Sequence, residues 1–154
     1  MRAGLLIPLL WLAHSASAEP TWNPRYHGQS VSQPFVEQVL IAEAGGEGPT
    51  GLYAVACVMR NLNWRLEAFS AAHRKDLDAF VRRQSARVRA DAARVVEALR
   101  HGAPDHTAGA DHYENIQAFG TPRWARGQTP VALIGHHTFY RLNAPPVTVR
   151  RLDE

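Results

Sequence analysis

The chain has 154 residues, of which 45% are hydrophobic and 20% are charged, and its formal net charge is +3 at pH 7. This size allows one domain with one substantial core, and the charge is too small to indicate a nucleic-acid-binding protein. The single cysteine, Cys57, excludes an internal disulfide and lies in the apolar run "GLYAVACVM". We therefore expect a buried, unreactive thiol, because a reactive one needs an exposed and electropositive setting.

The first residues, "MRAGLLIPLLWLAHSASAEP", are typical of an export signal. One basic residue, Arg2, precedes the apolar stretch 5–13, and a small-x-small cleavage signature follows at 16–18. The apolar stretch is too short for a transmembrane helix, and a simple N-terminal membrane anchor is the alternative. We expect residues 1–18 to be a signal peptide cleaved after Ala18, which predicts an exported protein in the periplasm or outside the cell, with a formal charge of +2.

Residues 19–34 are rich in turn formers and predict an irregular lead-in. A first helix should follow, because the apolar residues of "FVEQVLIA" recur at helical spacing. Ser32 or the residue after it can cap this helix, with Pro34 at the first helical position. Gly45 and Gly46 should end it, since glycine accepts the left-handed backbone found at many helix ends.

A second helix is predicted over 51–66, where apolar residues share one face, with residues 49–50 as its cap. A third helical region spans about 76–101, and its phase weakens at 84–85, which allows two helices with a break there. Gly102 should end this region. The run is basic: a solvated face is the usual meaning of such a charge run, and attraction to an anionic polymer is the functional alternative.

From residue 103 onward, glycine, proline, histidine and aromatic residues mix without a helical period. The segment "VALIGHHTFYRL" has the β-branched and aromatic content of a short strand or hairpin. These elements predict a single α+β domain, mostly α, over residues 35–142, with the strand or hairpin near its C-terminal end. Residues 143–154 are interpreted as a tail.

Glu43 is the first candidate for chemistry, because it ends an apolar helix just before the two glycines. A helix C-terminus is the unfavourable end of the dipole for an anion. Together with apolar neighbours, this favours the neutral carboxyl group that a general acid requires. The alternative is a helix-end carboxylate bonded to the backbone or to an arginine such as Arg60. Glu47, after the glycines, can face a helix N-terminus and stay ionised as a structural anchor.

Three motifs, in this order, resemble the SleB-type cell wall hydrolases. "IAEAGGEGPTGLYAVACVMRN" is similar to that family's opening motif, a helix with Glu-Ala-x-Gly-Glu before an alanine- and valine-rich helix that ends near Asn. "DHYENI" with "FGTPRWA", and then "IGHHTFYRL", are similar to its second half. That half pairs an aromatic-Asn segment and a Trp with a closing Ile-Gly-x-His-x-Phe. The resemblance covers about residues 35–142.

The resemblance implies a lysozyme-like fold that acts on peptidoglycan glycan strands and needs no cofactor and no metal. It implies that Glu43 is the catalytic acid, that Tyr113 and Asn115 orient the sugar, and that Trp124 stacks on the sugar or packs. The closing histidine falls on His137, a structural residue expected to hold the strand against the Glu43 helix by a hydrogen bond. We expect a monomer, with no nucleic-acid partner and no stable membrane insertion.

The family's lytic transglycosylases cleave the bond between N-acetylmuramic acid and N-acetylglucosamine. The muramyl 6-hydroxyl attacks within the sugar, and a 1,6-anhydro end results. One carboxylic acid suffices for this reaction, whereas other glycosidases use two. Glu114 is an extra carboxylate near the expected cleft, counted among the substrate-binding candidates, and it would make the enzyme a hydrolase if it activates water.

Two other functions remain open on the sequence. A zinc-dependent cell-wall amidase or peptidase would draw on the ligand types between residues 105 and 137, which are Asp105, His106, Asp111, His112, Glu114, His136 and His137. Adjacent histidines normally point apart on a strand, which weakens this alternative. A non-catalytic peptidoglycan-binding protein would keep the fold but is expected to lose Glu43, which is present.

Overall fold

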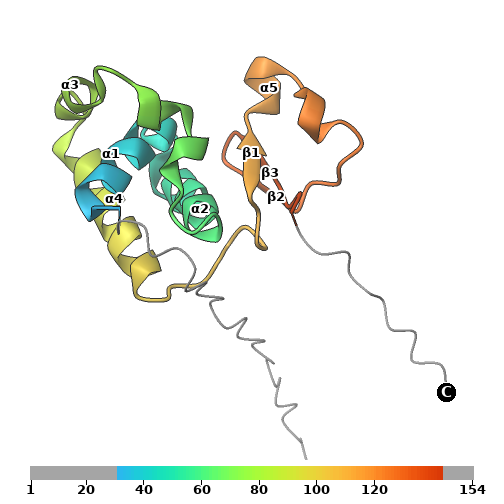
Figure 1. The fold of residues 1–154 in the computed structure, drawn as a ribbon, viewed down its shortest axis with the longest axis horizontal. Helices are drawn as coiled ribbons and strands as arrows, with labels where there is room; N and C mark the ends of the chain where they lie inside the picture. Colours follow the sequence, from blue (N-terminus) through green and yellow to red (C-terminus); the bar gives the residue numbers. More distant parts are fainter. Residues whose placement is uncertain (1–30, 144–154) are drawn as a thin grey trace, which may run out of the picture.

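The structure is a computed structural model that describes residues 31–143. The predicted signal peptide, most of the lead-in and the predicted tail lie outside these residues. Four helices form one side of the molecule: α1 (Gln33–Ala44), α2 (Gly48–Asn61), α3 (Leu77–Arg82) and α4 (Ala86–Arg100). A small antiparallel sheet lies beside α2, as Figure 1 shows. The predicted α+β class, mostly α, is confirmed.

Helix α1 begins where the sequence predicts, with Ser32 at the N-cap position and a proline in the first turn. The Ser32 side chain makes no capping hydrogen bond, and its backbone carbonyl accepts from the two residues that follow the proline. The left-handed backbone expected at Gly45 is absent, since its φ is −60°. Gly48 takes that conformation instead, with φ 71°, and the chain turns directly into α2.

Helix α2 begins at Gly48 and ends at Asn61, so the predicted span of 51–66 is shifted at both ends. Helix α2 ends earlier than predicted because the backbone leaves the helical conformation after it. Asn63 and Trp64 have φ values of 55° and 58°, which are incompatible with a right-handed α-helix. Leu66 then starts η1 (Leu66–Ala68), a short 3-10 helix, and η2 (Ser70–His73) follows. These two turns carry the chain back across the end of α1.

The predicted break in the third helical region is confirmed. Helix α3 ends at Arg82 and α4 begins after Ser85, whose hydroxyl accepts a hydrogen bond from the Val88 backbone N–H at 3.2 Å. Such a serine cap satisfies one of the free donors at a helix start. Gly102 follows the end of α4 with φ 84°, the left-handed conformation expected there.

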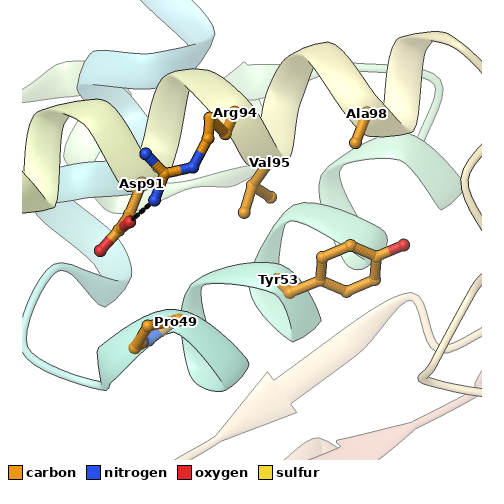
Figure 2. Close-up of a pocket in the computed structure, with 6 residues that line it drawn as sticks. All are labelled: Pro49, Tyr53, Asp91, Arg94, Val95 and Ala98. Atoms are coloured by element: carbon orange, nitrogen blue, oxygen red, sulfur yellow. Dashed lines mark hydrogen bonds and ion pairs between the residues drawn. The ribbon is translucent and has the colours of Figure 1, made fainter.

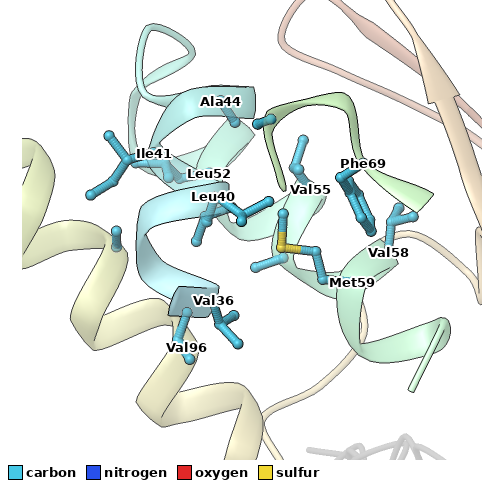
Figure 3. Packing of buried hydrophobic residues seen from close by; sticks show 14 of the residues in the cluster. Val36, Leu40, Ile41, Ala44, Leu52, Val55, Val58, Met59, Phe69 and Val96 are labelled. Atoms are coloured by element: carbon cyan, nitrogen blue, oxygen red, sulfur yellow. The ribbon is translucent and has the colours of Figure 1, made fainter. Parts of the chain in front are cut away.

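The core lies between α1, α2 and α4 (Figure 3). Leu40 from α1, Met59 from α2 and Val96 from α4 are fully buried, and Phe69 from between the two 3-10 helices packs against the same cluster. Cys57 is also fully buried, which confirms the expected thiol environment. Burial raises the pKa of this thiol to about 11, so it stays protonated and unreactive at neutral pH.

The sheet has the order β1-β3-β2, with β1 (His112–Glu114), β2 (Ala132–Ile134) and β3 (His137–Tyr140). Strands β2 and β3 form the hairpin predicted near the C-terminal end, while β1 was not predicted. In β1, Tyr113 lies opposite Phe139 of β3, and both side chains contact the helical core. Because side chains alternate along a strand, Glu114 and its partner Thr138 face the other side of the sheet.

Between β1 and β2 the chain forms the four-residue helix α5 (Ile116–Phe119) and the 3-10 turn η3 (Arg123–Ala125). Both stand on the sheet side of the molecule in Figure 1. Each helix within residues 31–143 is too short or too polar to cross a membrane.

Candidate active site

Glu43 lies in the last turn of α1, half-buried, and its carboxylate is held from two directions. Its Oε1 atom accepts hydrogen bonds from the Ala71 backbone N–H at 2.8 Å and from the Ser70 hydroxyl at 3.2 Å. Its Oε2 atom accepts one from the Tyr113 hydroxyl at 2.8 Å. The helical part and the sheet therefore meet at this carboxylate. Arg60, the alternative partner, instead donates to the Ala103 carbonyl.

The pattern of donors leaves one position on the Glu43 carboxylate open. A carboxylate offers about four lone-pair positions, two on each oxygen. Within the part of the chain that the structure describes, Oε1 receives two donors and Oε2 receives one. The remaining position belongs to Oε2, so this oxygen is the one that can carry a proton or meet a ligand.

Tyr113 is placed at this site by the alternation of β1, which turns its ring toward the helices. Burial raises the pKa of its hydroxyl well above the usual value of 10.0, and the charge of Glu43 and the hydrogen bond to it add to the shift. The hydroxyl therefore stays protonated at neutral pH and acts as a donor. The structure brings this predicted residue to Glu43, where it contacts the carboxylate itself.

Glu47 occupies the N-cap position of α2 but makes no capping hydrogen bond with its side chain. Its Oε2 atom instead accepts from His136, at 3.3 Å from the backbone N–H and at 3.1 Å from ring Nδ1. The predicted anchor is thus directed at the turn between β2 and β3. This contact joins two segments that lie 89 residues apart in the sequence.

His137, the first residue of β3, is buried, with 8% of its surface exposed. Its ring meets the Tyr113 ring edge-on, with centroids 5.0 Å apart. The expected hydrogen bond from His137 to the Glu43 helix is absent: Nδ1 has no hydrogen-bond partner among the described residues and lies 3.9 Å from Glu47 Oε2. That prediction is corrected, because Tyr113 bridges to Glu43 and His136 bridges to Glu47.

Asn115 and Glu114 are both bound to nearby backbone. The Asn115 side chain caps α5 by accepting from the Ala118 N–H at 3.0 Å. A Glu114 carboxylate oxygen accepts from the Asn115 N–H at 2.9 Å. By strand alternation Glu114 faces the sheet side opposite to Tyr113, and it makes no hydrogen bond to Glu43 among the described residues, although its charge adds to the raised pKa of Tyr113.

Trp124 packs on the same opposite face of the sheet. Its ring lies 5.1 Å from the His112 ring and 5.4 Å from the Tyr140 ring, and the second contact is perpendicular. His112 and Tyr140 are cross-strand partners on that face. Of the two predicted roles for Trp124, packing is therefore the one that its contacts describe.

Asp105 and Asp111, two of the acids considered as metal ligands, accept hydrogen bonds from the backbone of nearby loops. Asp105 accepts from the Thr107 N–H and hydroxyl and from the Gly109 N–H, each at 2.7 Å. Asp111 accepts from the backbone N–H of the two residues 142–143 that follow β3, at 2.8 Å each. Across residues 31–143, no three histidine, cysteine or acidic side chains gather in a way that could hold a metal ion.

The basic run of 74–100 is partly neutralised within itself. Asp76 faces Arg74 and Arg83, and Asp91 faces Arg87 and Arg94. Asp91 also lines a shallow hollow of about 220 Å³ between α2 and α4 (Figure 2), whose other lining residues are Pro49, Tyr53, Arg94, Val95 and Ala98. Glu43 is not among the residues that line it.

Sequence reasoning missed Ser70, the Ala71 backbone and His136 as members of the site. The first two lie on the 3-10 turn η2, which has no periodic signal and follows a helix predicted to be longer than it is. The signal for His136 was present, because it follows a glycine in a predicted hairpin, but only a three-dimensional structure shows that Glu47 is its partner.

No family model matches this chain, and neither a curated protein nor a solved structure matches it. The similarity to the SleB-type cell wall hydrolases therefore rests on the three sequence motifs alone.

Proposed function

We propose that this protein is an exported enzyme that cleaves the bond between N-acetylmuramic acid and N-acetylglucosamine in peptidoglycan, as a lytic transglycosylase of lysozyme-like fold. The observation that carries the proposal is the half-buried carboxylate of Glu43, fixed by three donors with one position left open on Oε2. It agrees with the role that the resemblance gives to this glutamate. Residues 1–18 would direct export and lie outside the described part of the chain.

The fixed geometry supports an acid/base role. A general acid must be within hydrogen-bonding distance of the leaving oxygen and correctly oriented, and errors of about 1 Å can cost about 100-fold in rate. The Ser70, Ala71 and Tyr113 donors come from two elements and set the plane of the Glu43 carboxyl group. Its Oε2 atom would then present the proton from a single direction.

The proposed reaction uses Glu43 twice. As the acid, it gives its proton to the glycosidic oxygen of the leaving N-acetylglucosamine while the bond from that oxygen to C1 of the muramyl residue breaks. As the base, it then accepts the proton of the muramyl 6-hydroxyl, whose oxygen bonds to C1. The products are a 1,6-anhydromuramyl end and a new free end, and the carboxyl group regains its proton.

The choice of a transglycosylase over a hydrolase is supported by the position of Glu114. A hydrolase needs a second group that activates water or attacks the sugar. Glu114 faces the side of the sheet opposite to Tyr113 and Glu43, and its carboxylate is bonded to the next backbone N–H. One acid together with the substrate's own hydroxyl is therefore the simpler chemistry at this site.

The test is the release of soluble fragments from purified peptidoglycan by the wild type, by Glu43→Gln and by Glu37→Gln. Glu37 is the matched control, because it is a half-buried carboxylate on the same helix, bonded to Gln33 at 2.9 Å. We expect Glu43→Gln to lose at least about 100-fold in rate, as loss of general acid–base catalysis usually does. Glu37→Gln should keep the wild-type rate, and an equal loss in both variants would contradict the role of Glu43.

A further inference from the structure

Two glycines lie against the Glu47 side chain, where it contacts the turn before β3. A Cβ atom on Gly51 would lie 2.3 Å from Glu47 Cβ, and one on Gly135 would lie 3.0 Å from Glu47 Oε2. Gly135 also has φ 61°, a conformation that other residues rarely adopt. Glycines on both sides therefore leave room for the Glu47 side chain to reach His136.

This contact continues through two more residues to Glu43. His136 leads directly into His137, whose ring meets the Tyr113 ring edge-on at 5.0 Å, and the Tyr113 hydroxyl donates to Glu43 at 2.8 Å. A shift of the β2–β3 turn would move His137 and, with it, the surface against which Tyr113 packs. Glu47 is thus connected to the Glu43 carboxylate through a series of contacts that runs by way of the β2–β3 turn and Tyr113.

The buried Nδ1 atom of His137 is a second, independent observation at the same place. It has no hydrogen-bond partner within residues 31–143 and lies 3.9 Å from Glu47 Oε2. A buried polar atom without a partner is costly and usually has a reason. Glu47 Oε2 is the carboxylate oxygen that faces this atom, so the same side chain that is bonded to His136 also lies against the His137 ring.

We propose that Glu47 is a positioning residue of the Glu43 site, which acts by fixing the β2–β3 turn and thereby the contact of His137 with Tyr113. The proposal rests on the proposed function, in which Glu43 is the acid/base. Glu47 itself does not touch the reacting atoms. Its effect is on where the Tyr113 hydroxyl, and therefore the Glu43 carboxylate, is held.

The first readout needs no substrate. The Tyr113 hydroxyl proton, which is partly buried and bonded to a carboxylate, should give a proton NMR signal that exchanges more slowly than that of an exposed tyrosine, assigned by its loss in Tyr113→Phe. In Glu47→Ala this signal should shift or disappear. In Glu47→Gln it should remain, because the amide oxygen can still accept from His136. If Glu47→Ala does not fold, His136→Ala takes its place, with the same loss expected.

The second readout is kinetic, on soluble peptidoglycan fragments. Glu47→Ala should lower kcat between about 10- and 100-fold at nearly unchanged KM, as small displacements of a catalytic group do. Glu47→Gln should restore most of kcat. The matched control is Glu97→Ala, which removes another carboxylate that faces a histidine, His101, at 3.5 Å on the exposed surface of α4. It should change neither readout.

An unchanged hydroxyl signal in folded Glu47→Ala would overturn the proposal, whatever the enzyme does. A raised KM with unchanged kcat would also overturn it, since Glu47 would then bind the glycan directly. If the wild type releases no fragments, the proposed function fails, and the hydroxyl signal still decides whether Glu47 positions Tyr113.

Discussion

Among single residues, the carboxylate of Glu43 is held by donors from two distant parts of the chain. Glu43 gets its donors from η2 and from β1, two segments that have the whole of α3 and α4 between them in the sequence. The donors to Oε1 need the 3-10 turn η2 to lie against α1, and the donor to Oε2 needs β1 of the sheet to do so. The geometry of the site is thus a product of the whole fold, although its central residue is visible in a short motif.

The pKa of Tyr113 gives a direct test of its contact with Glu43. Burial is the main cause of the raised pKa, and the negative charge of Glu43 adds to it. In Glu43→Gln that charge is gone, so the Tyr113 pKa should fall below its wild-type value but stay above 10.0, because burial remains. An alkaline titration of the labelled Tyr113 ring carbon by NMR measures this. An unchanged pKa would mean that the two side chains do not meet.

At the scale of elements, the long helices could be predicted because periodic apolar residues determine them. The break at Ser85 and the stop at Gly102 were also predictable, because a serine cap and a left-handed glycine are local features of the sequence. The C-terminal end of α2 was not predictable, because it depends on left-handed conformations at Asn63 and Trp64, and a bulky tryptophan rarely adopts that conformation.

Strand β1 could not be predicted from the sequence. Its three residues, "HYE", include only one apolar side chain, so no alternation can be detected. It is a strand because β3 pairs with it, and this pairing is what turns Tyr113 toward Glu43 and Glu114 away. The candidate residues were therefore largely found from the motif, whereas the side of the sheet that each one faces required the structure.

A substitution at Gly51 tests the packing between α2 and Glu47. In a helix, Gly→Ala should add about 1 kcal/mol of stability by propensity alone. At Gly51 the new Cβ would lie 2.3 Å from Glu47 Cβ, so we expect Gly51→Ala to lower the free energy of unfolding by about 1–3 kcal/mol, the usual cost of overpacking. Urea unfolding measures this difference.

Gly46→Ala is the matched control in the adjoining turn, because nothing lies within 4 Å of its added Cβ. It should leave the free energy of unfolding unchanged or slightly higher, since alanine restricts the unfolded chain. A Gly51→Ala protein as stable as Gly46→Ala would show that Glu47 does not lie over Gly51.

At the scale of the whole molecule, the buried thiol links stability to pH. Burial raises the Cys57 pKa from 9.0 to about 11, so the folded state keeps a proton that the unfolded state loses above pH 9. This contribution to stability is complete below pH 9 and is lost as the pH rises through about 11. At pH 11 the loss is about 2 kcal/mol.

Urea unfolding at pH 8 and pH 11 checks this prediction when wild type is compared with Cys57→Ala. Tyr53 and Tyr113 have raised pKa values as well, and burial, the main cause in each, is common to both proteins, whereas the charge of the ionised thiol adds to the Tyr53 shift only in the wild type. The wild type should therefore lose about 2 kcal/mol more than the variant between the two pH values. Equal losses would show that the thiol ionises as freely in the folded state as in the unfolded one.

The basic run of 74–100 carries eight lysines and arginines against four acids, so it stays positive after its internal ion pairs have formed. We expect this surface to help hold an anionic cell wall. Binding to insoluble peptidoglycan should then weaken as NaCl rises from about 0.05 to about 0.5 M, because salt screens exposed charges. Binding that does not change with salt would contradict a role of the basic run in binding the cell wall.

The central claim is that Glu43 cleaves glycan strands with the help of the substrate's own hydroxyl. The most direct measurement is mass spectrometry of the fragments that the protein releases from purified peptidoglycan. We expect fragments that end in 1,6-anhydromuramic acid, lighter by one water than reducing ends, and we expect none of them with Glu43→Gln. Reducing ends would contradict the transglycosylase reaction, and free peptides or no fragments at all would contradict glycan cleavage itself.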